Sequence, residues 1–349
     1  MFKTRMTEMF GIKHPIMLAG MNWITEPKLV AAVCNAGGLG LLATARFKPE
    51  EIRENICEIR RLTDKPFGIN QALAVPGSRE NMDVILEEKV PIINYSLGKP
   101  WFIDQVHSYG GKIIGTTAMS KHAVRAEQLG CDAIIVTGTE AAGHGTSASS
   151  FVLIPIVAKL VKVPIIAAGG IYDGRGMAAA LTLGADGVSM GTRFTLTRES
   201  NVHENFKQLC LKASEQDTLY GNAFDGMPGR VLKSKAAEKL MKGGYPLFEA
   251  IAGAEELRKM LGLSYWKFVG LSLQAWRSEE GSPVWVMARQ AVGAMRHLKA
   301  INEGDIEEGI LFASQGIGGI RDLPSVQELV DRMIKEAEEA MEQVKKTRK

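Results

Sequence analysis

Short apolar runs alternate with longer amphipathic stretches along the first 195 residues of the chain. The segment 164–194 shows the pattern most clearly. Its apolar run 164–168 leads into a glycine turn, then into apolar residues at helical spacing after Asp173, and then into the run 188–190. Runs that are apolar at every position are typical of strands buried on both faces, and apolar residues three or four apart are typical of helices. The segment is therefore predicted to form strand, turn, helix and strand.

Repeated along the chain, this alternation predicts eight strands and seven intervening helices in an α/β fold. The predicted strands are 15–21, 39–44, 66–70, 91–95, 112–117, 133–137, 164–168 and 188–190. The predicted helices are 27–36, 48–63, 79–88, 101–109, 121–129, 152–161 and the stretch after Asp173. Alternating strands and helices form parallel sheets, and eight evenly spaced units favour a closed (β/α)8 TIM barrel over the alternative, a doubly wound sheet.

The alternation stops after Phe194. We expect a helical domain over 200–309, without a convincing strand, from helical patterns at 204–213, 234–242, 254–261 and 284–302. A glycine turn at 311–316 and an amphipathic helix at 324–346 come next. The barrel is therefore expected to comprise residues 1–199 and 310–349. Its last helix either completes the outer ring of the barrel or covers one of its ends.

Composition and charge narrow the function classes. The 349 residues carry a formal net charge of +3, which is too close to balance to indicate a nucleic-acid partner. The four cysteines have no CxxC or metal-ligand spacing, and no cluster of His, Asp and Glu has it either, so we expect no metal site. The N-terminus lacks a signal-peptide core, and no apolar run is long enough to span a membrane. We expect a cytoplasmic enzyme or binding protein.

Catalytic groups of a parallel barrel lie at the carboxyl ends of its strands. In this chain those ends carry glycines and a few other residues, namely Gly20, Met21, Asn22, Asn70, Thr116, His144, Gly169, Gly170, Gly191 and Thr192. The glycine loops after the seventh and eighth strands stand where such barrels bind phosphate through backbone N–H groups. The alternative is that these glycines only make tight turns; we favour phosphate.

His144 is the best candidate for acid–base chemistry. It lies between Gly143 and Gly145 after the sixth strand, where an imidazole can donate or accept a proton at neutral pH. Glu140 either orients this histidine or caps the loop. Few other reactive side chains are present, which suits a phosphate-bearing cofactor that brings its own redox chemistry. The residues alone leave open whether the phosphate belongs to a flavin or to a phosphorylated substrate.

Six segments together resemble one known family. They are HPIMLAGM (14–21), NAGGLG (35–40), KPFGIN (65–70), EAAGHG (140–145), the segment 164–194 and ASQG (313–316). The family is that of the nitronate monooxygenases, formerly 2-nitropropane dioxygenases, which includes flavin-type enoyl-acyl carrier protein reductases and an NAD(P)H:quinone reductase branch. The resemblance implies an FMN-binding barrel with a helical substrate domain as a lid over its mouth.

The resemblance also implies roles for individual residues. His144 corresponds to the family's active-site histidine, which assists at the nitronate or its proton. The residues implied to contact FMN are Gly20, Met21, Asn22, Asn70, Thr116, Gly143, Gly169, Gly170, Ser189, Met190, Gly191, Thr192 and Gln315. Of these, Gly170 and 189–192 would hold the phosphate through backbone amides. Thr116 stands where the quinone reductase branch has a lysine, so the chain lacks a cation that would favour an anionic reduced flavin.

We therefore expect an FMN-dependent oxidoreductase, in the first place a nitronate monooxygenase that oxidises alkyl nitronates with O2. The alternative within redox chemistry is NAD(P)H-dependent reduction of a quinone or an enoyl thioester. A different class, a phosphosugar isomerase or aldolase type of barrel without flavin, would use the same phosphate loops, but no Schiff-base lysine ends a predicted strand. The expected partner is a small-molecule substrate, with NAD(P)H as reductant and a homodimer both left open.

Overall fold

The computed structural model describes residues 2–75, 77–242, 255, 258–259, 264–277 and 284–347. The chain forms two compact units. The first contains Met1–Ala141, Gly145–Asn201 and Gly319–Lys349, and the second contains Ala142–His144 and Val202–Gly318. Residues 142–144, from the loop after the sixth strand, therefore belong to the second unit. The pattern of the sequence does not indicate this membership.

The first unit is a closed (β/α)8 barrel, as the alternation predicts. Among the described residues its eight strands are parallel and follow the order β1-β8-β7-β6-β5-β4-β3-β2. They are β1 (Ile16–Leu18), β2 (Leu41–Ala43), β3 (Gly68–Ala72), β4 (Ile92–Ser96), β5 (Lys112–Thr117), β6 (Ala133–Thr137), β7 (Ile165–Ala168) and β8 (Gly187–Met190). A parallel bridge joins Met17 of β1 to Leu39, two residues before β2, and closes the sheet.

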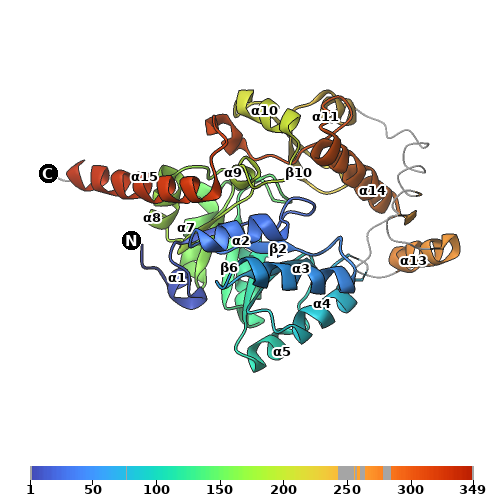
Figure 1. Ribbon diagram of the computed structural model, residues 1–349, viewed down its shortest axis with the longest axis horizontal. Coiled ribbons are helices and arrows are strands. Elements are labelled where there is room, and N and C mark those ends of the chain that lie inside the picture. The colour runs from blue at the N-terminus through green and yellow to red at the C-terminus, as the bar shows by residue number, and fades with distance from the viewer. Residues whose placement is uncertain are drawn as a thin grey trace. The chain divides into compact units, whose positions relative to one another are not determined.

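Helices cover the outside of this barrel (Figure 1). They are α2 (Pro27–Asn35), α3 (Pro49–Leu62), α4 (Ser78–Glu87), α5 (Ile103–Ser108), α6 (Ser120–Gln128), α7 (Ser150–Leu160) and α8 (Gly174–Thr182). Their amphipathic pattern explains this position: α3 buries Ile52, Ile56 and Ile59 while its charged residues face outward. Two short helices flank the series, α1 (Arg5–Phe10) before β1 and α9 (Thr192–Thr195) after β8.

Apolar side chains fill the barrel near the amino ends of its strands. Ile92, Ile114 and Ile166 belong to one buried cluster, to which α1 contributes Met6 and Phe10. Helix α1 therefore packs into this end of the barrel. Because close-packed apolar side chains leave no room for a ligand, the chemistry must lie toward the carboxyl ends of the strands.

The C-terminal helix α15 (Val326–Thr347) completes the outer ring, which is one of the two positions that the sequence left open for it. It packs against α8 and α2, the place of an eighth barrel helix (Figure 1). Gly174 at the start of α8 permits this close approach, because a Cβ there would lie 2.2 Å from the carbonyl oxygen of Met333. The Gly174 amide also donates a hydrogen bond of 2.8 Å to the Glu336 carboxylate.

The second unit is mainly helical but contains a two-stranded sheet. Its helices are α10 (Glu204–Lys212), α11 (Lys235–Met241), α13 (Tyr265–Arg277), α14 (Val284–Leu298), the π-helix η1 (Lys299–Glu303) and the 3-10 helix η2 (Gln315–Gly319). The strands β9 (Thr218–Gly221) and β10 (Gly229–Leu232) pair antiparallel. The expectation of no strand in this region is therefore wrong. Each strand has only four residues, too few for a two-residue alternation to stand out in the sequence.

A small apolar core holds the described part of the second unit together. Phe224, Val231, Ala237, Leu240 and Ile310 are buried in one cluster, which joins β10, α11 and the segment before η2. The predicted helix at 254–261 lies mostly outside the described residues. The other three helical predictions coincide with α10, α11 and α14 followed by η1.

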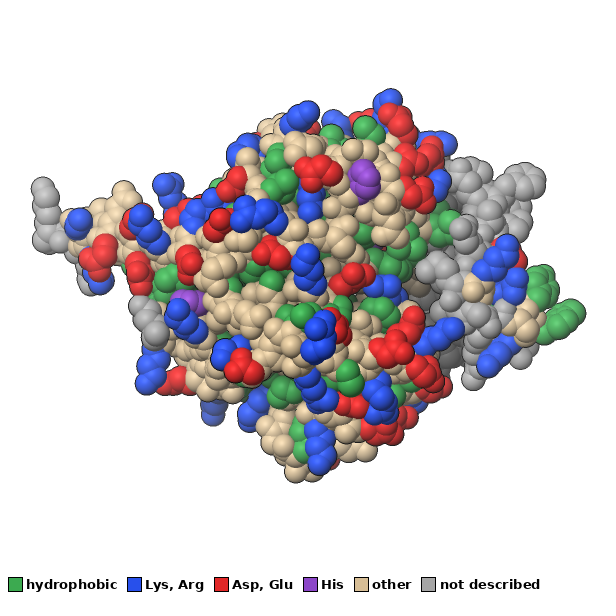
Figure 2. Space-filling view, in the orientation of Figure 1, with side chains coloured by type: hydrophobic (Ala, Val, Ile, Leu, Met, Phe, Trp, Pro, Cys, Tyr) green, Lys and Arg blue, Asp and Glu red, His purple; other side chains and the backbone are tan. Residues whose placement is uncertain are grey.

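The surface carries charges of both signs. On the face shown in Figure 2, Lys and Arg side chains are interspersed with Asp and Glu rather than gathered by sign. Of the helices that the structure describes, none is long and apolar enough to cross a membrane.

We predict that Gly174→Ala destabilises the protein by about 1–3 kcal/mol, because the new methyl group overlaps backbone atoms of α15 that cannot move singly. Thermal or urea unfolding of both proteins measures the difference. Gly270→Ala is the matched control: a Cβ at this helical position of α13 meets nothing within 4 Å, so the change should be neutral or slightly stabilising. Equal stability of wild type and Gly174→Ala would contradict the packing of α8 on α15.

Candidate functional site

A layer of polar side chains lies inside the barrel, next to the apolar cluster and toward the carboxyl strand ends. Side chains alternate along a strand, so residues two positions after Ile92 and Ile114 also face inward. These residues are Asn94 and Thr116. The Asn94 amide nitrogen donates to Thr116 Oγ1 at 2.9 Å and to the carbonyl oxygen of Ile114 at 3.0 Å. Asn70 Nδ2 in turn donates to Asn94 Oδ1 at 2.6 Å, so β3, β4 and β5 are linked by side chains.

The hydrogen bonds of this layer fix what it offers to a ligand. Both N–H groups of Asn94 are used, so its Oδ1 accepts and Asn70 keeps its own Oδ1 as an acceptor. Thr116 Oγ1 accepts from Asn94, and its hydroxyl proton has no acceptor within the described part of the chain. Asn94 was not among the site residues predicted from the sequence. Asn94 lies two residues after the buried Ile92, so its side chain also faces the inside of the barrel. That spacing is the signal in the sequence that could have identified it.

The loop after β1 packs on this layer. A Cβ at Gly20 would lie 2.4 Å from Asn70 Cβ, so only glycine leaves room for the asparagine. The backbone of Met21 is held by Thr25, whose hydroxyl accepts from Met21 N at 3.1 Å. The Asn22 Oδ1 atom is buried and, among the described residues, has no hydrogen-bond partner.

Strand β8 provides a second polar atom of this kind near its carboxyl end. A Cβ added to Gly187 would overlap Met6 of the apolar cluster, so position 187 faces the inside of the barrel. Ser189 lies two residues further along the same strand and therefore also faces inward. Its Oγ atom is buried and makes no hydrogen bond within the described chain. Buried polar atoms without a partner cost free energy, so a ligand that pairs with Ser189 and Asn22 is favoured here.

The glycine pair after β7 has a packing role. Gly169 and Gly170 have φ values of 118° and 72°, which residues with side chains rarely adopt. A Cβ would lie 2.9 Å from Ser150 Oγ at Gly169 and 3.1 Å from Glu140 Cβ at Gly170. Glu140 accepts hydrogen bonds from Ser150 N and Oγ at 3.0 and 2.9 Å, so of its two predicted roles it takes the cap, at the start of α7. These contacts account for both glycines without a phosphate.

The amino end of α8 is already satisfied by carboxylates. Asp173 accepts from Gly176 N at 2.8 Å and Glu336 accepts from Gly174 N at 2.8 Å. An anion is therefore better placed at the turn from β8 into α9, where Gly191 precedes Thr192. Behind this turn Arg193 is buried and donates to the carbonyl oxygen of Leu196 at 2.7 Å. Burial lowers the pKa of its guanidinium group.

His144 forms a hydrogen bond with Asp225, a residue of the same unit. Its Nε2 lies 2.7 Å from Oδ2 of Asp225, and the two side chains are 31% and 13% exposed. The other carboxylate oxygen of Asp225 accepts from Met227 N at 3.1 Å. Arg230 N on β10 donates to the carbonyl oxygen of Ala142 at 3.1 Å, which fixes the loop that carries the histidine. Asp225 was not among the residues predicted from the sequence, because it lies 81 positions after His144.

Two aromatic rings extend this pair. Phe312 lies edge-on to His144, with ring centroids 6.2 Å apart, and edge-on to His297 at 5.4 Å. Nδ1 of His297 lies 3.0 Å from the carbonyl oxygen of Ile310. Burial lowers the pKa of His297 to about 4, so this ring is neutral at pH 7 and adds no charge beside Asp225.

The predicted site residues divide between the two units. Those of the barrel unit are Gly20, Met21, Asn22, Asn70, Thr116, Gly169, Gly170, Ser189, Met190, Gly191 and Thr192. Gly143, His144 and Gln315 belong to the second unit. Within the barrel unit the structure brings together Gly20 with Asn70, Asn70 with Thr116 through Asn94, and Met21 with Gly191. No group of three His, Cys, Asp or Glu residues in the described ranges could hold a metal ion.

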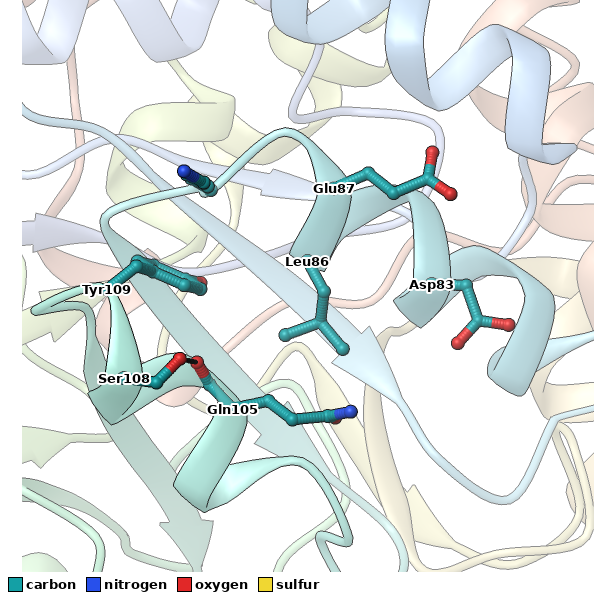
Figure 3. A pocket seen from close by; sticks show the side chains of 7 residues that line it. Asp83, Leu86, Glu87, Gln105, Ser108 and Tyr109 are labelled. Carbon is teal, nitrogen blue, oxygen red and sulfur yellow. Dashed lines mark hydrogen bonds between the residues drawn. The ribbon is translucent and has the colours of Figure 1, made fainter.

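An open groove on the outside of the barrel is separate from these residues. It lies between α4 and α5 (Figure 3), and its lining residues are Asp83, Leu86, Glu87, Lys89, Gln105, Ser108 and Tyr109. These side chains come from the helical layer and the loops beside it, whereas the candidate residues come from strand ends. The groove is therefore no part of the candidate site.

Comparisons with known proteins give a consistent family and varied activities. A family model described as nitronate monooxygenase matches residues 3–82 and 71–336. A Rhodococcus jostii protein named (3aS,4S,5R,7aS)-5-hydroxy-7a-methyl-1-oxo-octahydro-1H-indene-4-carboxyl-CoA dehydrogenase is 36% identical over 96% of this chain and 96% of its own. A probable nitronate monooxygenase of Staphylococcus aureus is 32% identical over 68% of this chain and 80% of its own. The solved structure of FabK from Thermotoga maritima has a TM-score of 0.80 and 35% identity, covering 99% of this chain and 100% of that one.

We predict that His297 makes the protein sensitive to acid. Its folded-state pKa of about 4 lies below the ordinary value of 6.5, so the unfolded chain binds a proton first and stability is lost as the pH falls from 6.5 toward 4. The loss attributable to this residue is at most about 3 kcal/mol. Urea unfolding at several pH values should show a shallower decline for His297→Gln than for wild type. Parallel declines would contradict the burial of a neutral imidazole.

Proposed function

Because the chain belongs to the nitronate monooxygenase family, and is an oxidoreductase of the flavin type, we propose that its cofactor is FMN and that His144 transfers a proton of the substrate. The observation that carries the proposal is the contact between His144 and Asp225. A histidine with a carboxylate on one ring nitrogen is a good proton acceptor for an activated C–H group. His144 and Asp225 both belong to the second unit.

The polar layer of the barrel supports a flavin. When bound, FMN accepts or returns the two electrons of the reaction. Its pyrimidine edge alternates hydrogen-bond acceptors with an N–H donor. Asn70 Oδ1 as an acceptor and the Thr116 hydroxyl as a donor suit such an edge. The buried atoms Ser189 Oγ and Asn22 Oδ1 provide further partners for the cofactor.

We place the phosphate of the proposed cofactor at the carboxyl end of β8 and the turn that follows it. Residues Ser189, Met190, Gly191 and Thr192, together with Gly170, would hold it through backbone amides, as the family resemblance implies. The carboxylates on the amino end of α8 support this choice over that helix. Arg193 stabilises the turn by donating to the carbonyl oxygen of Leu196 at 2.7 Å and, from Nη1, to the Asp322 carboxylate at 3.1 Å. Gly143 and Gln315 stay among the proposed cofactor contacts on the resemblance alone.

We propose an acyl thioester as the substrate class. The Rhodococcus jostii relative, named for an acyl-CoA substrate, aligns over 96% of this chain, whereas the Staphylococcus aureus relative aligns over 68%. The alignment with the relative named for an acyl-CoA substrate therefore covers more of this chain than the alignment with the relative named as a nitronate monooxygenase. The carbon next to a thioester carbonyl is weakly acidic, so His144 would take or return its proton. Oxidation of an alkyl nitronate with O2 is the second candidate, favoured by the family model. NAD(P)H would serve as reductant if the thioester is reduced.

The proposed cofactor and substrate predict distinct spectra. The purified protein should be yellow and release FMN, not FAD, on denaturation. Anaerobic mixing with a saturated acyl-CoA, or with NADPH followed by an enoyl-CoA, should change the flavin absorbance within the turnover time. A colourless protein that binds no FMN would reject the proposal. Bleaching by an alkyl nitronate, with no response to either thioester, would replace the thioester by the second candidate.

His144→Ala should retain FMN and lower turnover by about 10²–10⁴-fold, because it removes the group that handles the proton. Flavin content and steady-state kinetics measure the two effects. His122→Ala, at an exposed position of α6, is the matched control and should keep both at the wild-type level. Loss of FMN from the His144 variant would instead show a structural role.

A further inference from the structure

We propose that Asp225 is a positioning residue for His144: it holds the Nε2–H tautomer of the ring and thereby leaves Nδ1 as the nitrogen that exchanges the proton with substrate. The proposal rests on the proposed role of His144. It adds the residue that orients the ring and the nitrogen that reacts. Neither follows from the spacing of residues in the sequence, because the two side chains come from segments 81 residues apart.

The contact decides which ring nitrogen carries the hydrogen. Asp225 Oδ2 lies 2.7 Å from Nε2 of His144, and a carboxylate only accepts hydrogen bonds. In the neutral imidazole Nε2 is then the donor, and the lone pair lies on Nδ1. Nδ1 has no hydrogen-bond partner among the described residues. It is therefore the nitrogen left for a substrate proton.

The histidine needs an external partner to hold its ring. Its neighbours Gly143 and Gly145 give the backbone more freedom than other residues would, and a Cβ at Gly143 would meet nothing within 4 Å. Phe312 limits the ring on one side, with centroids 6.2 Å apart. An edge-on aromatic contact restrains position but does not choose a tautomer. The carboxylate is the group that does so.

Asp225 is itself fixed on two sides. Its Oδ1 accepts from Met227 N at 3.1 Å. Behind it, α14 comes so close that a Cβ on Gly293 would lie 2.5 Å from the carbonyl oxygen of Phe224 and 3.0 Å from Asp225 Cβ. The backbone and Cβ of Asp225 are therefore packed on the helix, and its carboxylate is held by the turn that follows it as well as by the histidine. Such support is what a positioning residue requires.

The pair completes a balanced proton transfer. The C–H bond of the substrate breaks, its hydrogen becomes the Nδ1–H of His144, and the electron pair stays on the substrate as a delocalised anion. The ring is then positively charged, and Asp225 at Nε2 stabilises that charge without taking the proton. In the reverse direction the same Nδ1–H returns its proton to carbon.

The tautomer can be measured without turnover. In the FMN-loaded protein with ¹⁵N-labelled histidine, correlation of the ring nitrogens with the carbon-bound ring protons distinguishes Nε2–H from Nδ1–H. His144→Asn identifies the signals of His144. Wild type should show the Nε2–H form. Asp225→Asn should show less of it, because an amide can also donate to Nε2.

Kinetics test the consequence. Asp225→Asn should lower kcat by about 10²–10⁴-fold and leave KM within about threefold, with FMN content unchanged. Asp225→Glu should recover part of the loss. Asp217→Asn is the matched control in the same unit: Asp217 accepts from Ser214 N and Oγ at 2.8 and 2.7 Å, so its loss should change neither the tautomer nor kcat.

Two outcomes would overturn the proposal. One is an unchanged His144 tautomer in Asp225→Asn. The other is wild-type kcat in Asp225→Asn while His144→Ala is slow. Failure of the proposed function looks different, because His144→Ala would then turn over normally even though the tautomer responds to Asp225.

Discussion

Closure of the eight-stranded sheet is the constraint on which the rest of the barrel depends. The pairing of Met17 with Leu39 joins the first and second strands, so every strand has two neighbours and one face directed inward. Side chains then enter the interior at every second position. The isoleucines near the amino ends form an apolar layer, and Asn70, Asn94 and Thr116 form a polar one beyond it. The amino end is packed with apolar side chains, so space for a ligand is expected only toward the carboxyl end.

Most of the barrel could be predicted from the sequence because its strands are buried on both faces and its helices on one. Those environments produce continuous apolar runs and helical spacing, as at 164–168 and 48–63. The hairpin β9–β10 was not predicted from the sequence for two reasons. Each of its strands has only four residues. In addition, Val231 of β10 pairs with Phe312, which lies far away in the sequence. Long-range pairing of that kind leaves no local pattern.

The candidate site was predictable where residues lie at the ends of predicted strands, and unpredictable where a partner comes from elsewhere in the fold. The inward direction of Asn94 could be predicted, because it lies two residues after the buried Ile92 in the same strand. Asp225 has no such signal: its role depends on residues 142–144 packing with β10, which no periodicity records. Glycines were the most ambiguous residues. Gly20 and Gly174 are explained by close approach of Asn70 and of α15, so a glycine at a strand end is weak evidence of a ligand by itself.

The candidate residues are divided between the two units, and this division bears on why one family includes proteins named for different activities. The polar layer and the β8 turn consist of barrel residues, and electron transfer to a flavin needs little more from the protein than binding and orientation. The proton is a separate requirement. A thioester enolate and a nitronate are both anions formed by loss of a proton from carbon beside an electron-withdrawing group, so on the proposed function a single histidine with a fixed tautomer would serve either. Residues of the second unit hold that histidine through Asp225 and Phe312. On the proposed function, substitutions beside Asp225 or Phe312 would change the proton transfer without altering the barrel residues that suit the cofactor.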